Sequence, residues 1–292
     1  LLDREGNVLT ASSEADYSRH AVISPDGDQA ATTAFDVRKG TADIWIHDLE
    51  RNLRTRFTFE DATEDHPIWS PDGSTVYYAG AGNSADDGIY RKQVGGTGAA
   101  ELLFESDSEP LPTDVSPDGQ QLLFNSTGEG LALDFHVLDL NGERESRALR
   151  ATPFVEGGGV FSPDGRWVAY FSNDSEAFHV YVSPYPDLSR RWQVSTVPGV
   201  YHDWIATPEG EEIVYLGIDG IVRAVKVSTE GDSLQIGTAE ELFKTWSPEP
   251  GGARYSVSAD GQRFLAIPET RTMTDASTKL ILNWPLKLGN DR

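Results

Sequence analysis

The sequence contains no cysteine and only one methionine among its 292 residues. The absence of cysteine excludes disulfide bonds and thiolate chemistry. No apolar stretch approaches the roughly 18–20 residues that a membrane-spanning helix needs, and no signal peptide is recognisable. The single methionine is Met273 and the chain opens on Leu1 and Leu2. We therefore expect the chain to be part of a longer or processed protein.

Basic residues are scarce as well. The chain has 24 Lys and Arg against 47 Asp and Glu, which gives a formal net charge of -23. Such a surface repels nucleic acid and anionic lipid, so we expect no nucleic-acid partner and no direct membrane insertion. Two interpretations of the charge stay open. It is either a solvated, salt-tolerant surface or the mark of a function that depends on cations or basic partners.

The common signatures of catalysis are also missing from the sequence. There is no Gly-x-Ser-x-Gly nucleophile elbow, no phosphate-binding loop, no kinase motif set and no His-Glu-x-x-His. Calcium loops of the Asp-x-Asp-x-Asp-Gly type are absent too. These absences exclude a complete prolyl oligopeptidase, although not its isolated propeller, and they favour a protein that is not an enzyme.

A four-residue turn motif, Ser-Pro-Asp-Gly, recurs along the whole chain. Four copies begin at Ser24, Ser70, Ser116 and Ser162, and two weaker copies begin at Thr207 and Ser258. The first residues are therefore 46, 46, 46, 45 and 51 positions apart. Strand-rich repeats of about 40–50 residues are typical of propeller blades, so the period predicts six blades.

The second repeat shows how the motif relates to the strands. Proline presets the backbone of a type I turn, aspartate bonds nearby amides, and glycine takes the left-handed position that follows. The turn therefore joins two antiparallel strands. Residues rich in β-branched and aromatic side chains predict further strands at 75–79, 87–94 and 101–104. No apolar pattern with a helical period competes with this assignment.

We accordingly predict an all-β, six-bladed propeller of four-stranded antiparallel blades, with residues 1–292 forming one domain. The predicted blades are at about 20–62, 63–108, 109–153, 154–199, 200–248 and 249–288, with a closing strand in 1–10. The sixth blade supplies strands only at 253–258, 262–267 and 279–284. We therefore expect residues 6–10 to be its outer strand, which closes the ring without a free sheet edge.

Several segments resemble the TolB-like, WD40-like (PD40) propellers of bacteria. They are residues 151–170 around Ser162-Pro163-Asp164-Gly165, residues 172–175 and 180–186, Asp43-Ile44-Trp45 with Asp48-Leu49, the entry segment 2–6, and the closing segment 280–284. The resemblance covers essentially the whole chain. It departs from the family pattern at Glu209, where aspartate is usual, and at Ala259, where proline is usual.

The chain is most similar to the propellers at the C-terminal end of bacterial receptor-type serine/threonine kinases. That resemblance implies an extracytoplasmic sensor or protein-interaction module within a larger protein. It is specific for the fold and poorly specific for function, because propellers carry many unrelated functions.

The turn motif also predicts where the mouth of the central channel lies. Four positions before each turn are His20, His66, Pro112, Gly158, Asp203 and Arg254. Among their neighbours are Asp65 and the residues Glu64, Glu156, Tyr201, His202 and Trp204. We predict a ligand-binding rim from nine residues: His20, Glu64, His66, Glu156, Tyr201, His202, Asp203, Trp204 and Arg254.

Three functions are compatible with such a rim. The first is a module that binds a protein, a peptide or a small molecule. The second is a metal-dependent hydrolase or lyase, because imidazoles and carboxylates suit transition metals and acid–base catalysis; its ligands would be His20, His66, His202 and Asp203. The third is a scaffold that self-associates. We assign no catalytic residue, and the only cofactor that the rim suggests is a divalent cation. The sequence does not indicate an oligomeric state.

Overall fold

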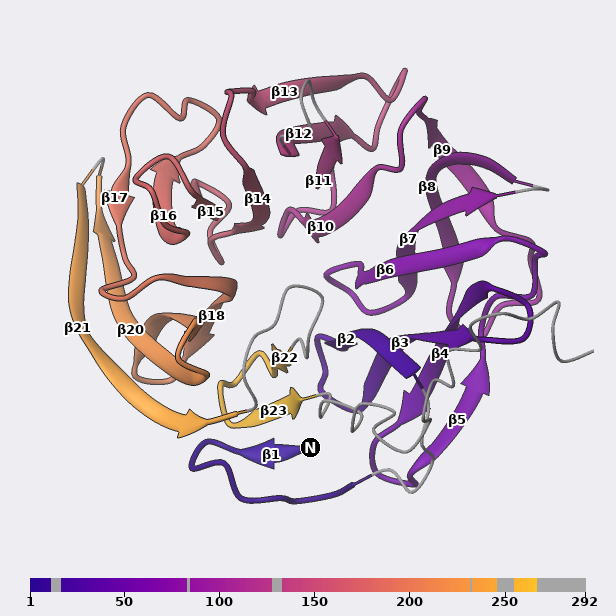
Figure 1. Cartoon of the computed structure of the whole chain (residues 1–292), viewed down its shortest axis with the longest axis horizontal. Helices are drawn as coiled ribbons and strands as arrows, with labels where there is room; N and C mark the ends of the chain where they lie inside the picture. Colours follow the sequence, from indigo (N-terminus) through magenta and orange to yellow (C-terminus); the bar gives the residue numbers. More distant parts are fainter. Residues whose placement is uncertain (12–16, 83–84, 128–132, 232, 246–254, 267–292) are drawn as a thin grey trace, which may run out of the picture.

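Six antiparallel sheets surround one central axis (Figure 1). This computed structural model describes residues 1–11, 17–82, 85–127, 133–231, 233–245 and 255–266. Every regular element in these ranges is a β-strand, and none of them contains a helix long and apolar enough to cross a membrane. The prediction of a six-bladed, all-β propeller is confirmed.

Strand order within blades one to five follows chain order from the axis outward. The inner strands are β2 (Tyr17–Ile23), β6 (Thr63–Trp69), β10 (Leu111–Val115), β14 (Glu156–Phe161), β18 (Gly199–Thr207) and β22 (Tyr255–Val257). The second strands are β3 (Gln29–Asp36), β7 (Thr75–Gly82), β11 (Gln121–Thr127), β15 (Trp167–Ser172), β19 (Gly210–Gly217) and β23 (Arg263–Ala266). The third strands of blades one to five are β4 (Thr41–Asp48), β8 (Ala85–Gln93), β12 (Leu133–Asp139), β16 (His179–Pro184) and β20 (Ile221–Glu230). The outer strands are β5 (Leu53–Arg56), β9 (Glu101–Glu105), β13 (Ser146–Arg150), β17 (Trp192–Gln193) and β21 (Ser233–Lys244).

The turn between the inner and the second strand is built around the serine hydroxyl. In the second blade, the hydroxyl of Ser70 donates to Asp72 at 2.6 Å and accepts from the backbone N–H of Thr75 at 3.0 Å. The carboxylate of Asp72 also accepts from the backbone N–H of Ser74 at 3.0 Å. Gly73 takes a φ of 71°, which favours glycine. These bonds fix the register of the two strands.

The same bonds form in the sixth blade, where Ser258 donates to Asp260 at 2.5 Å although alanine replaces proline. The fifth turn is different. Thr207 pairs directly with Gly210 in a two-residue hairpin loop, and β18 and β19 extend to it without interruption. Asp203 lies four residues before Thr207, but it is structurally equivalent to the residue that lies two positions before the turn serine in the other blades. Counting back from the shorter turn of blade five therefore gives a position that differs by two residues from the position reached in the other blades.

Each of the first five inner strands carries a β-bulge before the turn. The register shifts lie at Ser18/Ala21, Asp65/Ile68, Pro112/Asp114, Gly157/Val160 and Val200/His202. Within three of these bulges the backbone is left-handed, with φ of 54° at His66, 66° at Gly158 and 48° at Tyr201. Bulges turn side chains away from the regular alternation of a strand, so each of these strands presents extra residues to the axis.

Apolar clusters between adjacent blades form the core. Between blades four and five, Trp167 and Val180 pack against Tyr215 and Val225. All four side chains are buried. Because each blade packs on two neighbours, the core is continuous only if the sixth blade also contacts the first.

The N-terminal strand completes the sixth blade. β1 (Leu2–Asp3) pairs with β23 through Leu2 and Phe264, and Val8 bridges to Leu2 on the outer side. Leu2 joins the apolar cluster of blades five and six, and Arg4 bonds to Glu212 at 2.6 Å. Closure by the N-terminal segment is therefore confirmed, with residue 8 in the predicted outer position.

One part of that prediction is wrong. We expected residues 279–284 to be the third strand of the sixth blade, but β22 and β1 pair with the two edges of β23. The third position thus belongs to β1, because a strand in a sheet has only two edges. Residues 279–284 lie outside the described residues. The short stretch Leu2–Asp3 gave no pattern long enough to identify a strand.

Removal of residues 1–10 should lower the melting temperature sharply, because it exposes an edge of β23 and removes Leu2 from the core. Thermal unfolding followed by circular dichroism measures this effect. A transition at the wild-type temperature would contradict closure of the ring by β1. As a matched pair, Leu2→Ala should cost about 2–5 kcal/mol, whereas Val8→Ala should stay within about 0.5 kcal/mol, since Val8 is 67% exposed.

Candidate functional site

The bulges surround one end of the channel, where a cavity of about 600 Å³ opens. We call it the bulge-end cavity. Five residues counted four positions before the turns line it, namely His20, His66, Pro112, Gly158 and Asp203. The sixth, Arg254, lies outside the described residues. Tyr201 and His202 line it as well.

A second cavity of about 410 Å³ lies at the end of the channel that carries the turns. We call it the turn-end cavity. The two cavities share five lining residues on the inner strands, which are Val22, Ile68, Thr113, Val160 and Asp203. These residues form the waist between them. Trp204 lines the turn-end cavity rather than the predicted rim, and its indole N–H donates to Glu211 at 2.9 Å.

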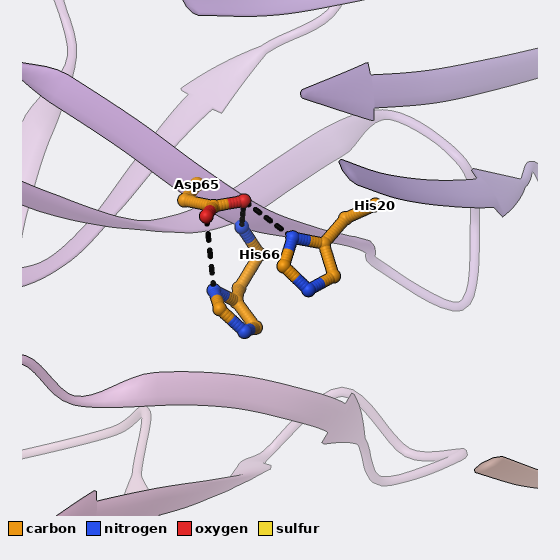
Figure 2. Close-up of side chains that lie close together, drawn as sticks. All are labelled: His20, Asp65 and His66. Atoms are coloured by element: carbon orange, nitrogen blue, oxygen red, sulfur yellow. Dashed lines mark hydrogen bonds and ion pairs between the residues drawn. The ribbon is translucent and has the colours of Figure 1, made fainter. Parts of the chain in front are cut away.

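His20 and His66 meet on the wall formed by blades one and two, together with Asp65 (Figure 2). The Nδ1 atom of His20 lies 2.5 Å from Oδ1 of Asp65. The Nδ1 atom of His66 lies 3.7 Å from Oδ2 of the same carboxylate. The two imidazole ring centroids are 3.8 Å apart. From the sequence, Asp65 was predicted only to be a neighbour of the rim residues, whereas in the structure it lies at the centre of this cluster.

The carboxylate of Asp65 stays ionised although it is buried. Burial alone would raise its pKa, but the hydrogen bond with His20 and the two neighbouring imidazoles outweigh that effect and hold the pKa well below its usual range. The backbone N–H of His66 also donates to Asp65 at 2.7 Å. A stable negative charge therefore organises both histidines.

The other predicted polar residues of the cavity come from β18 of blade five. Burial lowers the pKa of His202 to about 4, so its ring is neutral near pH 7. Burial raises the pKa of Asp203 to about 7, and its carboxylate accepts from the backbone N–H of Val257 at 3.4 Å. His202 and Asp203 do not belong to the cluster of His20, Asp65 and His66, whose ligand atoms lie within 4.8 Å of one another.

Two predicted rim residues lie between blades instead of on the cavity wall. Glu64 is 2% exposed and accepts from the hydroxyl of Thr58 at 3.0 Å. Glu156, with 0% exposure, accepts from Arg150 at 3.1 Å and from the hydroxyl of Thr152 at 2.7 Å. The two glutamates occupy equivalent positions six residues before a turn. Both join the connection from the preceding outer strand to their own inner strand, which is an architectural role.

Asp114 and Tyr255 are polar cavity residues that were not predicted from the sequence. Asp114 lines the turn-end cavity and accepts from the backbone N–H of Phe161 in the next blade at 2.7 Å, as Asp203 does with Val257. Burial and the nearby Asp203 raise the pKa of Asp114 to about 7. Tyr255 lines the bulge-end cavity from blade six. An alignment of blade five that allowed for its shorter turn would have found Asp114, because it then matches Asp203.

No known protein-family profile matches the chain. A Bacillus subtilis (strain 168) protein named uncharacterized peptidase YuxL is 25% identical over 192 residues, which are 52% of this chain and 29% of that protein. The uncharacterized protein Atu1656 of Agrobacterium fabrum is 30% identical over 106 residues, 35% of this chain and 34% of that protein. The chain thus spans about a third of the length of the curated relatives that it matches.

Solved structures share the fold over most of the chain. A putative TolB from Agrobacterium tumefaciens has a TM-score of 0.67 and 18% identity, with 87% of this chain and 91% of that chain covered. TolB from Acinetobacter baumannii has a TM-score of 0.55 and 16% identity, covering 85% and 63%. An oligogalacturonate lyase in complex with manganese has a TM-score of 0.56 and 14% identity, covering 84% and 69%. The fold is therefore that of TolB-like six-bladed propellers, as the resemblance implied.

Buried carboxyl groups should make the protein less stable as the pH rises. Burial raises the pKa of Glu64 to about 8, and those of Asp114 and Asp203 are about 7. A pKa that is higher in the folded state favours folding at low pH, and that contribution is lost as pH rises through the folded value. The melting temperature should fall between pH 6 and pH 8, and Glu64→Gln should flatten this decline.

Differential scanning calorimetry at pH 6, 7 and 8 measures the effect. The exposed Glu145→Gln is the matched control and should retain the wild-type slope. An equal slope in Glu64→Gln and the wild type would refute the assignment.

Proposed function

We propose that the chain is a ligand-binding propeller module that holds a small molecule or a peptide segment in the bulge-end cavity. The observation that carries this proposal is the cavity itself, about 600 Å³ in volume at the mouth of the channel. A preformed concavity of this size with a few polar groups on apolar walls is typical of ligand sites. The missing catalytic signatures favour binding over catalysis.

The cavity walls combine an apolar body with separated polar groups. Phe171, Phe178 and Leu111 supply apolar surface. The hydroxyl groups of Tyr255 and Thr113 are buried at the wall and have no hydrogen-bond partner among the described residues. Buried polar groups are normally satisfied, so a ligand with hydrogen-bonding groups fits these positions. The imidazoles of His20 and His66 add a third polar position.

The module belongs, in this proposal, to a larger bacterial protein that operates outside the cytoplasm as a sensor or interaction partner. The TolB-like fold supports this setting, and so does a chain that covers about a third of its curated relatives. The resemblance to kinase-linked propellers suggests that binding is reported to an attached domain. The net charge of -23 favours a partner without strong negative charge.

A metal-dependent hydrolase or lyase is the second candidate, and one contact favours it. The Asp65 carboxylate lies 2.5 Å from Nδ1 of His20, and a carboxylate in that position orients an imidazole for general acid–base work. This function would also need a bound cation in the cavity. The enzyme hypothesis therefore requires more of the site than ligand binding does.

Substitutions on blades five and six should test ligand binding without touching the two histidines. A panel of peptides, organic acids and sugars is first screened by thermal shift, and affinities of the stabilising compounds are then measured by calorimetry. Asp203→Asn and Tyr255→Phe should each weaken binding about tenfold or more, because each removes a polar contact at the wall worth about 1.4 kcal/mol.

The exposed Asp28→Asn serves as the control for loss of charge and should bind as the wild type does. Unchanged affinity in both Asp203→Asn and Tyr255→Phe would place the ligand elsewhere and end the proposal for this cavity.

A further inference from the structure

We propose that His20, Asp65 and His66 form a divalent transition-metal site in the wall of the bulge-end cavity. The two histidines provide the metal ligands, and Asp65 orients them. This inference goes beyond ligand binding, because the ion binds whether or not the cavity takes an organic ligand.

Repetition of the blades brings the two histidines together. His20 and His66 are 46 residues apart, which is one repeat, and they occupy the bulges of the adjacent inner strands β2 and β6. One potential donor atom from each of His20, Asp65 and His66 lies within 4.8 Å of the other two. In Figure 2 both rings lie on the same side of the carboxylate, and the Nε2 atom of each points away from it.

Asp65 prepares His20 to bind a metal. Its Oδ1 atom lies 2.5 Å from Nδ1 of His20, so the proton of the neutral ring belongs on Nδ1 and the lone pair on Nε2. Histidine ligands in metal sites almost always donate their other N–H to a carboxylate or carbonyl in this way, which fixes the tautomer and the ring orientation. Asp65 is 6% exposed, and the contact is shielded from water.

Asp65 also holds His66 in an uncommon conformation. His66 has a φ of 54°, a conformation that is uncommon for residues other than glycine, although asparagine, aspartate and histidine adopt it more often than the rest. Its backbone N–H donates to Oδ1 of Asp65 at 2.7 Å. Strained backbone that is held by its surroundings is concentrated at functional sites. Here the strain places the second imidazole 3.8 Å from the first, centroid to centroid.

The donor atoms indicate the class of ion. Imidazole nitrogen suits zinc, nickel, copper and iron, whereas calcium and magnesium prefer oxygen ligands. Two imidazole nitrogens on one zinc ion are about 3.3 Å apart, since each bond is about 2.0–2.1 Å. Rings with centroids 3.8 Å apart can supply that spacing. Two protein donors leave coordination positions for water or for a ligand in the cavity.

Calorimetric titration of the EDTA-treated and dialysed chain with zinc chloride tests the site. We expect one zinc ion per chain and no binding of calcium chloride under the same conditions. His20→Gln and His66→Asn should each abolish stoichiometric zinc binding. Asparagine is chosen at position 66 because it tolerates the left-handed backbone, and thermal unfolding of each variant verifies that it is folded.

The control is His179→Ala, which removes a histidine bonded to Ser195 and Gln193 in blade four and should leave zinc binding unchanged. Asp65→Asn should weaken zinc binding about 10–100-fold, the usual effect of changing a residue that orients a ligand. The same affinity in Asp65→Asn as in the wild type would overturn the role of Asp65. Full zinc binding in both His20→Gln and His66→Asn, or none in the folded wild type, would overturn the site.

The titration uses no organic ligand, so its outcome is separate from that of the proposed binding function. Asp203→Asn and Tyr255→Phe lie on other blades and should retain zinc binding even if they lose an organic ligand. Loss of zinc binding in these two variants would contradict a site confined to blades one and two.

Discussion

The position of every channel-lining residue in this propeller depends on the register between an inner strand and its second strand. The serine hydroxyl sets that register, because it bonds the turn aspartate and the backbone of the second strand at once. In the first blade these bonds join Ser24 to Asp26 at 2.6 Å and to the N–H of Gln29 at 2.9 Å. A slip of one residue would turn every side chain of the strand to its opposite face. The turns thus control which side chains reach the channel, although none of their polar groups belongs to the histidine cluster.

The β-bulges of the inner strands bring the side chains of the histidine cluster together at the channel. In a regular strand, successive side chains point to opposite faces, so only every second side chain of β2 or β6 would face the axis. An extra residue in the inner strand places Asp65 and His66 so that the carboxylate of one contacts the rings of both histidines. The left-handed backbone of His66 and Tyr201 is unfavourable by itself. It is compensated by bonds within the bulge, such as that from the N–H of His66 to Asp65.

The fold could be predicted from the sequence because each repeat contains the same turn motif and the same pattern of strands. The six turns, their strands and the channel positions of His20 and His66 could be predicted, since one pattern applied six times. What could not be predicted broke that pattern. The shorter loop at Thr207 displaced the count for Asp203 by two residues, and β1 was too short to show a period. Glu64 and Glu156 were predicted at the rim because they are polar and close to it in sequence. Spacing from the turn, however, does not show which side chains near a bulge point toward the axis.

The two cavities share a property that limits what they can bind. None of their described lining residues is a lysine or an arginine, while Asp114 and Asp203 face the channel, and the chain as a whole carries a charge of -23. An anionic ligand would therefore find no permanent positive charge inside. A metal ion on His20 and His66 would change this, because it adds positive charge to one wall and leaves Asp203 on another. The metal site would then determine the charge of the ligand that the cavity accepts. Without the ion the cavity would favour a neutral or cationic molecule, and with the ion it would favour a carboxylate or another anion.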